Sequence, residues 1–183
     1  MSRIPLTSID RNPEAIRQFM ARRGELNLFR LLANAPHMFT GWTRMVDEML
    51  DSPTFTVRMR ELVILRVAHL QGSPYELVQH EWLARCAGLT QQQIDALTDA
   101  GDLDAAGFSH HERTVLDLIT ELCTTRRLAY GTFAAAQTAV GDAAVTELLM
   151  IISCYYGLAL VLNAVELEVD AVARLQLSTG ECA

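Results

Sequence analysis

The sequence predicts an all-α protein, and three observations support this. No stretch alternates apolar and polar residues as a half-exposed strand would. All five prolines lie at or before Pro74, so the rest of the chain carries no residue that breaks a helix in this way. Half of the 183 residues are hydrophobic and a fifth are charged, which is typical of a folded globular chain. At this length we expect a single domain, 1–183.

The first part of the chain is expected to begin with an irregular arm, 1–11. Asn12 and Pro13 form a helix start, and Gly24 stands where that helix should end. The turn Asp51-Ser52-Pro53 closes this part of the chain. Its expected helices are 13–23, 27–34 and 36–50.

Two helices follow, about 57–70 and 73–86, joined at Gln71-Gly72-Ser73. Ser73 as N-cap, Pro74 at the first helical position and Glu76 two residues later predict a capping box. Gly88 stands where a glycine commonly follows a helix. This pair of helices contains the candidate site.

In the second half, two more capping boxes are expected, Thr90 with Gln93 and Ser109 with Glu112. They would open helices at about 90–100 and 109–127. A short helix, 132–140, ends at Gly141, and a long apolar helix runs from about 142 to 169. The core of the domain is expected at about 27–170, with 178–183 as a tail.

The long apolar helix includes eighteen residues without a charge, 148–165. That is the lower edge of the length needed to span a membrane, but its flanks, Glu147 and Glu166, lack a basic cluster. We therefore expect a helix buried in the core and at a subunit interface, and no membrane partner. The excess of apolar residues indicates a homo-oligomer.

Charge and cysteine content limit the partners and the compartment. The net charge of −7 argues against nucleic acid and against an anionic membrane surface. The four cysteines form no C-x-x-C pair, and the first residues include no apolar signal segment. We expect reduced thiols and a cytoplasmic location.

Glu61 is the first candidate site residue, because it lies within an apolar stripe. Its neighbours at helical spacing are Val57, Ile64, Leu65 and Ala68. Burying an unpaired carboxylate there would cost several kcal/mol, so a partner is required. That partner is either a functional group or an arginine such as Arg60 in a structural ion pair. An edge position partly in water is a further alternative.

Glu76 and His80 form the second candidate feature, since they lie four residues apart on one helix face. Leu83 and Ala84 continue that face, which would limit access of water to the pair. The alternative is a satisfied core histidine and a glutamate that only caps its helix.

Other clusters do not indicate a site. His110, His111 and Glu112 are consecutive and point apart on a helix, which favours a solvated helix start. No H-E-x-x-H or paired cysteines occur, so neither a metal nor a cofactor is expected. Tyr155 and Tyr156 are interpreted as structural aromatics of a buried helix.

The spacing around His80 resembles the carboxymuconolactone decarboxylase and alkylhydroperoxidase-D-like superfamily. Its redox branch has Glu, eleven residues, Cys-x-x-Cys, three residues, His. This chain has Glu61, eleven residues, Ser73-Pro74-Tyr75-Glu76, three residues and His80, so the spacing is kept and both cysteines are absent. The decarboxylase branch resembles it in pairing a glutamate with a histidine four residues later. The stretches AGLTQQQIDAL and YYGLALVLNAVELEVD are also similar to larger members, and the resemblance covers about 27–170.

The resemblance implies an oligomeric helical bundle, a trimer or a hexamer. It also implies a cofactor-free acid/base lyase or isomerase that acts on a small lactone or carboxylate. Proton transfer would be carried out by His80 with Glu76 and Glu61, and substrate contacts would come from Arg60, Ser73 and Tyr75. Two alternatives remain: a thiol peroxidase or reductase, which lacks its cysteines here, and a non-catalytic oligomeric binder of a small molecule.

Overall fold

The computed structural model describes residues 2–98 and 100–171, and within these ranges every regular element is helical. The all-α prediction is therefore confirmed. The predicted tail, 178–183, lies outside the described residues. After the short 3₁₀ helix η1 (Ile9–Arg11), the α-helices are α1 (Glu14–Arg23), α2 (Asn27–Leu32), α3 (Pro36–Leu50), α4 (Val57–Leu70), α5 (Pro74–Cys86), α6 (Gln91–Ala96), α7 (His110–Thr125), α8 (Tyr130–Val140) and α9 (Asp142–Val165).

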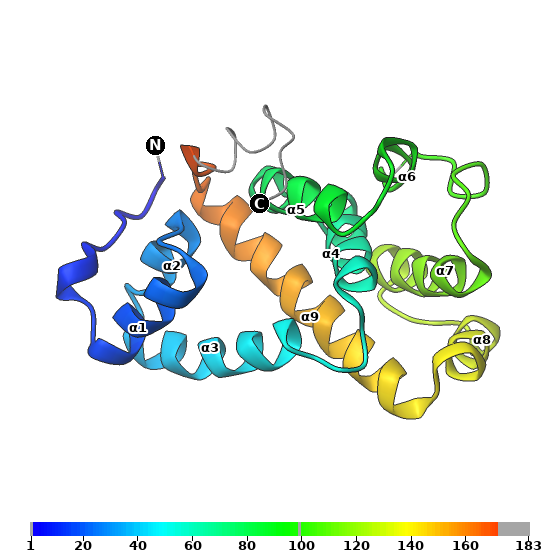
Figure 1. The fold of residues 1–183 in the computed structure, drawn as a ribbon, viewed down its shortest axis with the longest axis horizontal. Helices are drawn as coiled ribbons and strands as arrows, with labels where there is room; N and C mark the ends of the chain where they lie inside the picture. Colours follow the sequence, from blue (N-terminus) through cyan, green and yellow to red (C-terminus); the bar gives the residue numbers. More distant parts are fainter. Residues whose placement is uncertain (1, 99, 172–183) are drawn as a thin grey trace.

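Helices α4 and α9 form the centre of the arrangement. Figure 1 shows α9 running diagonally between α1–α3 on one side and α4–α8 on the other. Helix α4 packs against α5, α7 and α9, and every residue from Arg60 to Ala68 is buried. The helix that carries Glu61 is thus enclosed by other helices rather than lying on the surface.

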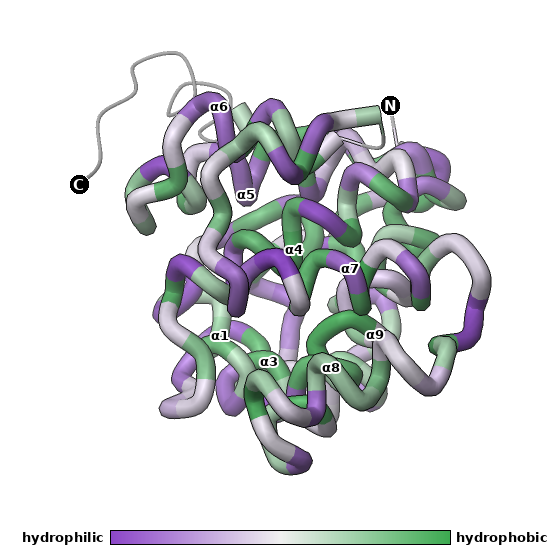
Figure 2. Tube along the Cα trace, turned by 90° about the vertical axis from the view of Figure 1, so that its right-hand side faces the viewer, coloured by the Kyte–Doolittle hydropathy of each residue, from purple (hydrophilic) through white to green (hydrophobic). Residues whose placement is uncertain are grey.

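The core has a large and a small part. The large part joins α1–α3 to α4, α7 and α9, with Phe19, Phe29 and Phe39 packed against one another. The small part lies among α4, α5, α6 and α7 and includes Leu62 and Leu116. Figure 2 shows the strongly hydrophobic sequence of α9 lying beside α8.

Two helix ends differ from the prediction. The helix expected at 90–100 ends at Ala96, and the long helix expected to reach 169 ends at Val165. Glu166 takes a left-handed conformation, with φ 52°, which stops α9. The N-terminal arm is tied to this end, because the Arg3 amide donates to the Val165 carbonyl at 2.8 Å.

Two of the three predicted capping boxes are present. Thr90 with Gln93 and Ser109 with Glu112 form both of the expected reciprocal hydrogen bonds. The box predicted for Ser73 with Glu76 is wrong, because the Ser73 side chain makes no capping hydrogen bond. The Glu76 carboxylate pairs with the His80 ring instead of with the backbone at the start of the helix.

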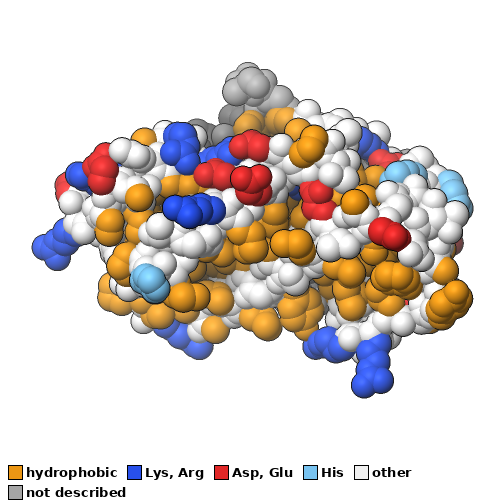
Figure 3. Space-filling model, turned by 90° about the horizontal axis from the view of Figure 1, so that it is seen from below, with side chains coloured by type: hydrophobic (Ala, Val, Ile, Leu, Met, Phe, Trp, Pro, Cys, Tyr) orange, Lys and Arg blue, Asp and Glu red, His pale blue; other side chains and the backbone are white. Residues whose placement is uncertain are grey.

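Helix α9 is long and apolar enough, by length and composition, to cross a membrane. However, 44% of its most apolar window is buried inside the molecule, where it contacts α4 and α8. The outward side exposes Met150, Leu160 and Val161. Figure 3 shows hydrophobic side chains gathered over one face of the molecule.

Candidate active site

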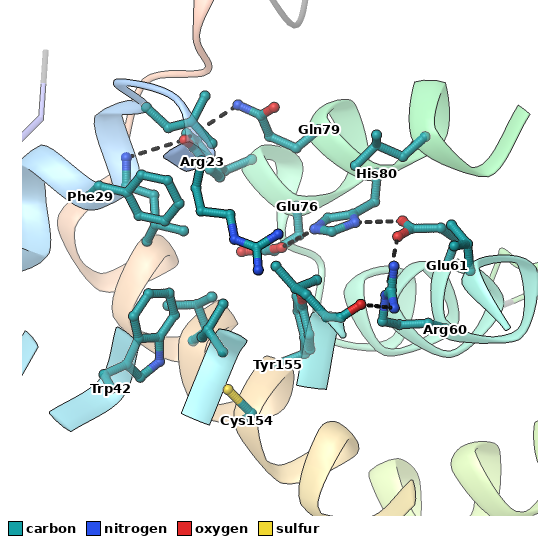
Figure 4. A pocket seen from close by; sticks show the side chains of 18 residues that line it. Arg23, Phe29, Trp42, Arg60, Glu61, Glu76, Gln79, His80, Cys154 and Tyr155 are labelled. Atoms are coloured by element: carbon teal, nitrogen blue, oxygen red, sulfur yellow. Dashed lines mark hydrogen bonds and ion pairs between the residues drawn. The ribbon is translucent and has the colours of Figure 1, made fainter. Parts of the chain in front are cut away.

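A cavity of about 280 Å³ opens where α4, α5 and α9 meet α1–α3. Figure 4 shows its side chains converging from these helices. Glu61, Glu76 and His80 all line it, which brings the three predicted catalytic residues together. The other lining residues are Arg23, Leu26, Leu28, Phe29, Trp42, Val46, Leu50, Val57, Arg60, Tyr75, Gln79, Leu83, Cys154, Tyr155 and Leu158.

His80 lies between the two carboxylates. Its Nδ1 is 2.7 Å from Glu61 Oε2, and its Nε2 is 3.3 Å from Glu76 Oε2. Glu61 comes from α4, whereas Glu76 and His80 lie one turn apart on α5. Glu61 is only 2% exposed, and His80 is its hydrogen-bond partner. The buried partner that the sequence predicted for Glu61 is therefore present.

This arrangement determines the charge of the imidazole. Burial by itself would lower the pKa of His80, but the Glu61 carboxylate and then the Glu76 carboxylate outweigh it and raise the pKa to about 10. Both ring nitrogens therefore carry hydrogen, and each donates toward one carboxylate. At neutral pH the imidazole is therefore charged, and it lies between the two glutamate side chains.

Glu76 retains one unused acceptor. It is 2% exposed, and its Oε1 atom is buried without a hydrogen-bond partner, while Oε2 faces His80. An unpaired buried carboxylate oxygen is costly, and perturbed groups of this kind are concentrated at functional sites. Oε1 is the atom of the unit that is open to accept a proton or a hydrogen bond from a ligand.

Arg60 lies next to the unit and is mostly engaged with protein atoms. Its Nη1 donates to the Leu50 carbonyl at 2.6 Å, and its Nε is 3.8 Å from Glu61 Oε1. The structural ion pair considered for Glu61 is thus present together with the histidine contact. The Nε atom is buried and has no hydrogen-bond partner.

Aromatic rings form much of the cavity wall. The Tyr155 ring meets the His80 ring edge to face, with 5.4 Å between centroids. Phe29 and Trp42, at 6.2 Å between centroids, line the opposite part of the cavity. The sequence interpretation of Tyr155 as purely structural missed this contact, because nothing in the sequence of α9 shows which turn faces α5.

Tyr75 lines the cavity, but its hydroxyl is engaged elsewhere. It donates to Asp170 Oδ2 at 2.6 Å and accepts from the Leu28 amide at 3.2 Å. Burial and the Asp170 carboxylate raise the pKa of Tyr75. Asp170 also accepts from Gln79 and from the Asn27 amide. The chain after α9 is thereby fastened to α2 and α5 at the edge of the cavity.

Ser73 does not line the cavity. Its side chain is fully buried, and its hydroxyl has no hydrogen-bond partner. The substrate contact predicted for Ser73 therefore has no support in this geometry. Arg60 and Tyr75, the other two predicted substrate-binding residues, do line the cavity.

Arg23 is a cavity residue that sequence reasoning missed. It comes from the C-terminal end of α1 and pairs with Asp47 at 2.9 Å and with Asp51 at 3.1 Å, both on or next to α3. Trp42 and Gln79 were missed as well. These residues carry no local motif, and only the tertiary arrangement of α1, α3 and α5 brings them to one cavity.

Neither Cys123 nor Cys154 is part of a disulfide. Cys154 lines the cavity, and burial raises its pKa to about 11, so it is a thiol at neutral pH. Cys123 is also buried, with its pKa raised to about 11. Cys86 is disulfide-bonded, so the expectation that all four cysteines are reduced is wrong for this residue.

Comparison with known families and structures agrees with this architecture. The model of the carboxymuconolactone decarboxylase family matches residues 36–119, which include α3–α5 and most of α7. No curated protein matches the chain by sequence. The family match therefore covers the helices that carry Glu61, Glu76 and His80.

Solved structures extend the similarity to almost the whole chain. A peroxidase-related protein with an alkylhydroperoxidase core from Ralstonia eutropha JMP134 is 20% identical, with TM-score 0.80 over 95% of both chains. A peroxidase-related protein from Silicibacter sp. TM1040 is 14% identical, with TM-score 0.80 over 94% of this chain and 93% of that one. The debrominase Bmp8, as a cysteine-to-alanine variant in complex with 2,3,4-tribromopyrrole, is 14% identical, with TM-score 0.79 over 99% of this chain and 100% of that one. These similarities show a shared fold, and the family match makes the part of the chain at 36–119 similar to the carboxymuconolactone decarboxylase family.

Proposed function

We propose that this protein is an acid/base lyase or isomerase that transfers protons at a carbon atom of a small molecule. The observation that carries the proposal is the buried Glu61–His80–Glu76 unit in the wall of the cavity, with Glu76 Oε1 unpartnered. The match to the carboxymuconolactone decarboxylase family model supports the class of activity, and the debrominase neighbour, bound to a pyrrole, supports a cavity suited to a small ring. No cofactor is required for this chemistry.

The proposed chemistry divides between the three side chains. Glu76 accepts a proton from the substrate carbon, and the C–H electrons move to an adjacent carbonyl oxygen to form an enolate. The positive charges of His80 and Arg60 stabilise that enolate, and Glu76 then returns the proton to another carbon. Glu61 fixes the orientation of the His80 ring and keeps it charged. If a carboxylate leaves as CO₂ instead, the electrons of the broken C–C bond form the enolate, His80 donates a proton to the carbon left behind, and His80 then regains a proton from water.

A thiol peroxidase is disfavoured by the same geometry. Ser73 and Glu76 occupy the positions of the two cysteines in the redox motif. The cavity thiol, Cys154, has a raised pKa, and the reactive form in such enzymes is the thiolate. A non-catalytic binder would keep the cavity but would have no use for a buried charged unit.

Hydrogen–deuterium exchange at carbon tests the proposal without knowledge of the natural substrate. The protein is incubated in D₂O with a panel of small lactones and enolisable carbonyl compounds, and the loss of C–H signals is followed by proton NMR. We expect exchange with some members of the panel. His80→Gln should slow it by about 10²–10³-fold, the usual cost of removing a group that stabilises a developing oxyanion. Glu76→Gln should add little to that loss, because the residues act as one unit.

His110→Gln is the matched control, since His110 is an exposed histidine at the start of α7. It should leave the exchange rate unchanged. Exchange that persists at the full rate in His80→Gln would contradict the proposal. So would an absence of exchange across the panel combined with dithiol-dependent peroxide turnover that is lost in Cys154→Ser.

A further inference from the structure

Each cationic group that lines the cavity already has a carboxylate partner. These groups are Arg23, Arg60 and His80. Their partners are Asp47, Asp51, Glu61 and Glu76, and Asp47 also pairs with Arg22. Among the described residues that line the cavity or pair with its lining, no cation is left over for an anionic ligand. A carboxylate entering this space would lose its hydration and meet Glu76 without a compensating charge.

The unpartnered polar atoms specify a different ligand. Glu76 Oε1 can only accept a hydrogen, and Arg60 Nε can only donate one. A ligand that satisfies both offers a weakly acidic hydrogen and a neutral acceptor such as a carbonyl oxygen. Binding such a ligand gives both atoms a hydrogen-bond partner.

The shape and lining of the cavity limit the rest of the molecule. Phe29, Trp42 and Tyr155 provide aromatic surfaces, and leucines form much of the remaining wall of the cavity. At about 280 Å³ the cavity lies near the lower end of the range, roughly 300–1,000 Å³, usual for small-molecule sites. One planar ring with a short substituent fits these limits, and aromatic faces favour unsaturated rings.

We infer that the cavity selects an uncharged, planar carbonyl compound about one ring in size and discriminates against carboxylates of the same shape. This deepens the proposed function, and it rests on that proposal only for the choice of the site. The inferred ligand class also favours one of the two proposed reactions, isomerisation or decarboxylation. An uncharged carbonyl compound has no carboxylate to lose, so proton transfer between carbons is favoured over decarboxylation.

Benzamide and benzoate test this inference, because they have nearly the same shape and differ in charge. Their dissociation constants are measured by NMR titration at pH 7.5, with the indole N–H signal of Trp42 reporting occupancy of the cavity. We expect benzamide to bind at least about tenfold more tightly than benzoate, because only benzoate leaves a buried charge uncompensated. In Glu76→Gln one carboxylate is removed, so the preference should fall toward equality.

Glu81→Gln is the matched control, since Glu81 lies on the same helix but pairs with Arg85 and does not line the cavity. It should keep the wild-type preference. Equal or tighter binding of benzoate to the wild-type protein would overturn the inference, as would a preference that Glu76→Gln leaves unchanged. An unmoved Trp42 signal with both probes would also overturn it, because the cavity would then accept no planar ring.

These outcomes are independent of turnover. If benzamide is preferred but no carbon acid exchanges deuterium, the proposed function fails and the selection for uncharged ligands stands. If exchange occurs but benzoate binds more tightly, the acid/base function stands and the ligand class is wrong.

Discussion

At the scale of single residues, Ser73 and Glu76 show how a buried polar group can differ from its expected role. A serine before a proline and a glutamate predicts a cap, yet the Ser73 hydroxyl is buried and unpaired. Glu76 is turned toward His80, which offers a charged hydrogen bond in place of a neutral one. The local motif was readable from the sequence, but the competing partner was not.

Ser73→Ala should therefore leave the free energy of unfolding unchanged or raise it by up to about 1 kcal/mol, because it removes a buried hydroxyl without a partner. Urea unfolding measures this directly. Ser109→Ala is the matched control, since Ser109 forms a complete capping box. This substitution should lower the free energy of unfolding by about 1 kcal/mol. A loss of 1 kcal/mol or more in Ser73→Ala would mean that its hydroxyl is hydrogen-bonded after all.

The raised pKa of His80 predicts a pH dependence of stability. A group whose pKa is higher in the folded than in the unfolded protein stabilises the fold fully below its unfolded pKa, near 6.5. That contribution is lost as the pH rises toward the folded pKa of about 10. Glu61, Glu76 and Tyr155 are the titratable groups that face the ring. The wild-type protein should thus become less stable from pH 6.5 to pH 10.

His80→Gln should flatten this slope, because glutamine does not titrate. Denaturant unfolding at several pH values between 6 and 10 measures both curves, and the chain contains no lysine whose titration would overlap. If the two proteins show the same slope, the stability of the fold does not depend on a charged His80.

The acid/base residues of the candidate site could be predicted from the sequence, whereas the other residues around the cavity could not. Glu61, Glu76 and His80 were identified because a carboxylate in an apolar stripe and an i, i+4 pair are both visible in the sequence. Arg23 and Trp42 were not, because they come from α1 and α3, and the tertiary arrangement that brings these helices to the cavity leaves no local pattern. Asp170 was missed for the same reason, since its partners, Tyr75 and Asn27, are far away in the sequence.

At the scale of helices, Arg58 connects the predicted capping boxes to the central helix. From α4 it donates to Glu112 Oε1 and to Gln93 Oε1, each at 2.9 Å, and also to the Gly88 carbonyl. Glu112 and Gln93 are the third residues of α7 and α6 and already take part in those boxes. The boxes themselves were visible in the sequence, whereas this link between three helices was not.

Arg58→Ala should lower the free energy of unfolding by about 1–3 kcal/mol, because it leaves partly buried acceptors on two helix starts without their charged donor. Thermal or urea unfolding measures the change. Arg44→Ala, an exposed arginine on α3, should stay within about 0.5 kcal/mol of the wild-type protein. Equal effects of the two substitutions would mean that Arg58 contributes only as a surface charge.

At the scale of the whole molecule, the outer side of α9 is an exposed hydrophobic surface. Leu160 and Met150 are 56% and 51% exposed, and hydrophobic side chains gather over one face of the molecule. The resemblance to the superfamily implies a trimer or a hexamer. We propose a soluble homo-oligomer in which this side of α9 contacts another copy of the chain.

Light scattering in buffer without detergent should give a mass several times that of the 20.3 kDa chain. Leu160→Glu should reduce that mass, because a charge would then be buried at the interface. Thr124→Glu, at an exposed position on α7, should not change it. A stable monomer of the wild-type protein, or recovery only from membranes, would contradict the proposal.

The charge of His80 is central to both the proposed acid/base unit and the proposed ligand class. Nitrogen NMR of ¹⁵N-histidine-labelled protein measures that charge directly, and the spectrum of His80→Gln identifies the His80 signals among the five histidines. We expect both ring nitrogens of His80 to carry hydrogen up to about pH 9, because the neighbouring glutamates raise its pKa to about 10. A His80 ring that becomes neutral near pH 6.5 would contradict the charged Glu61–His80–Glu76 unit.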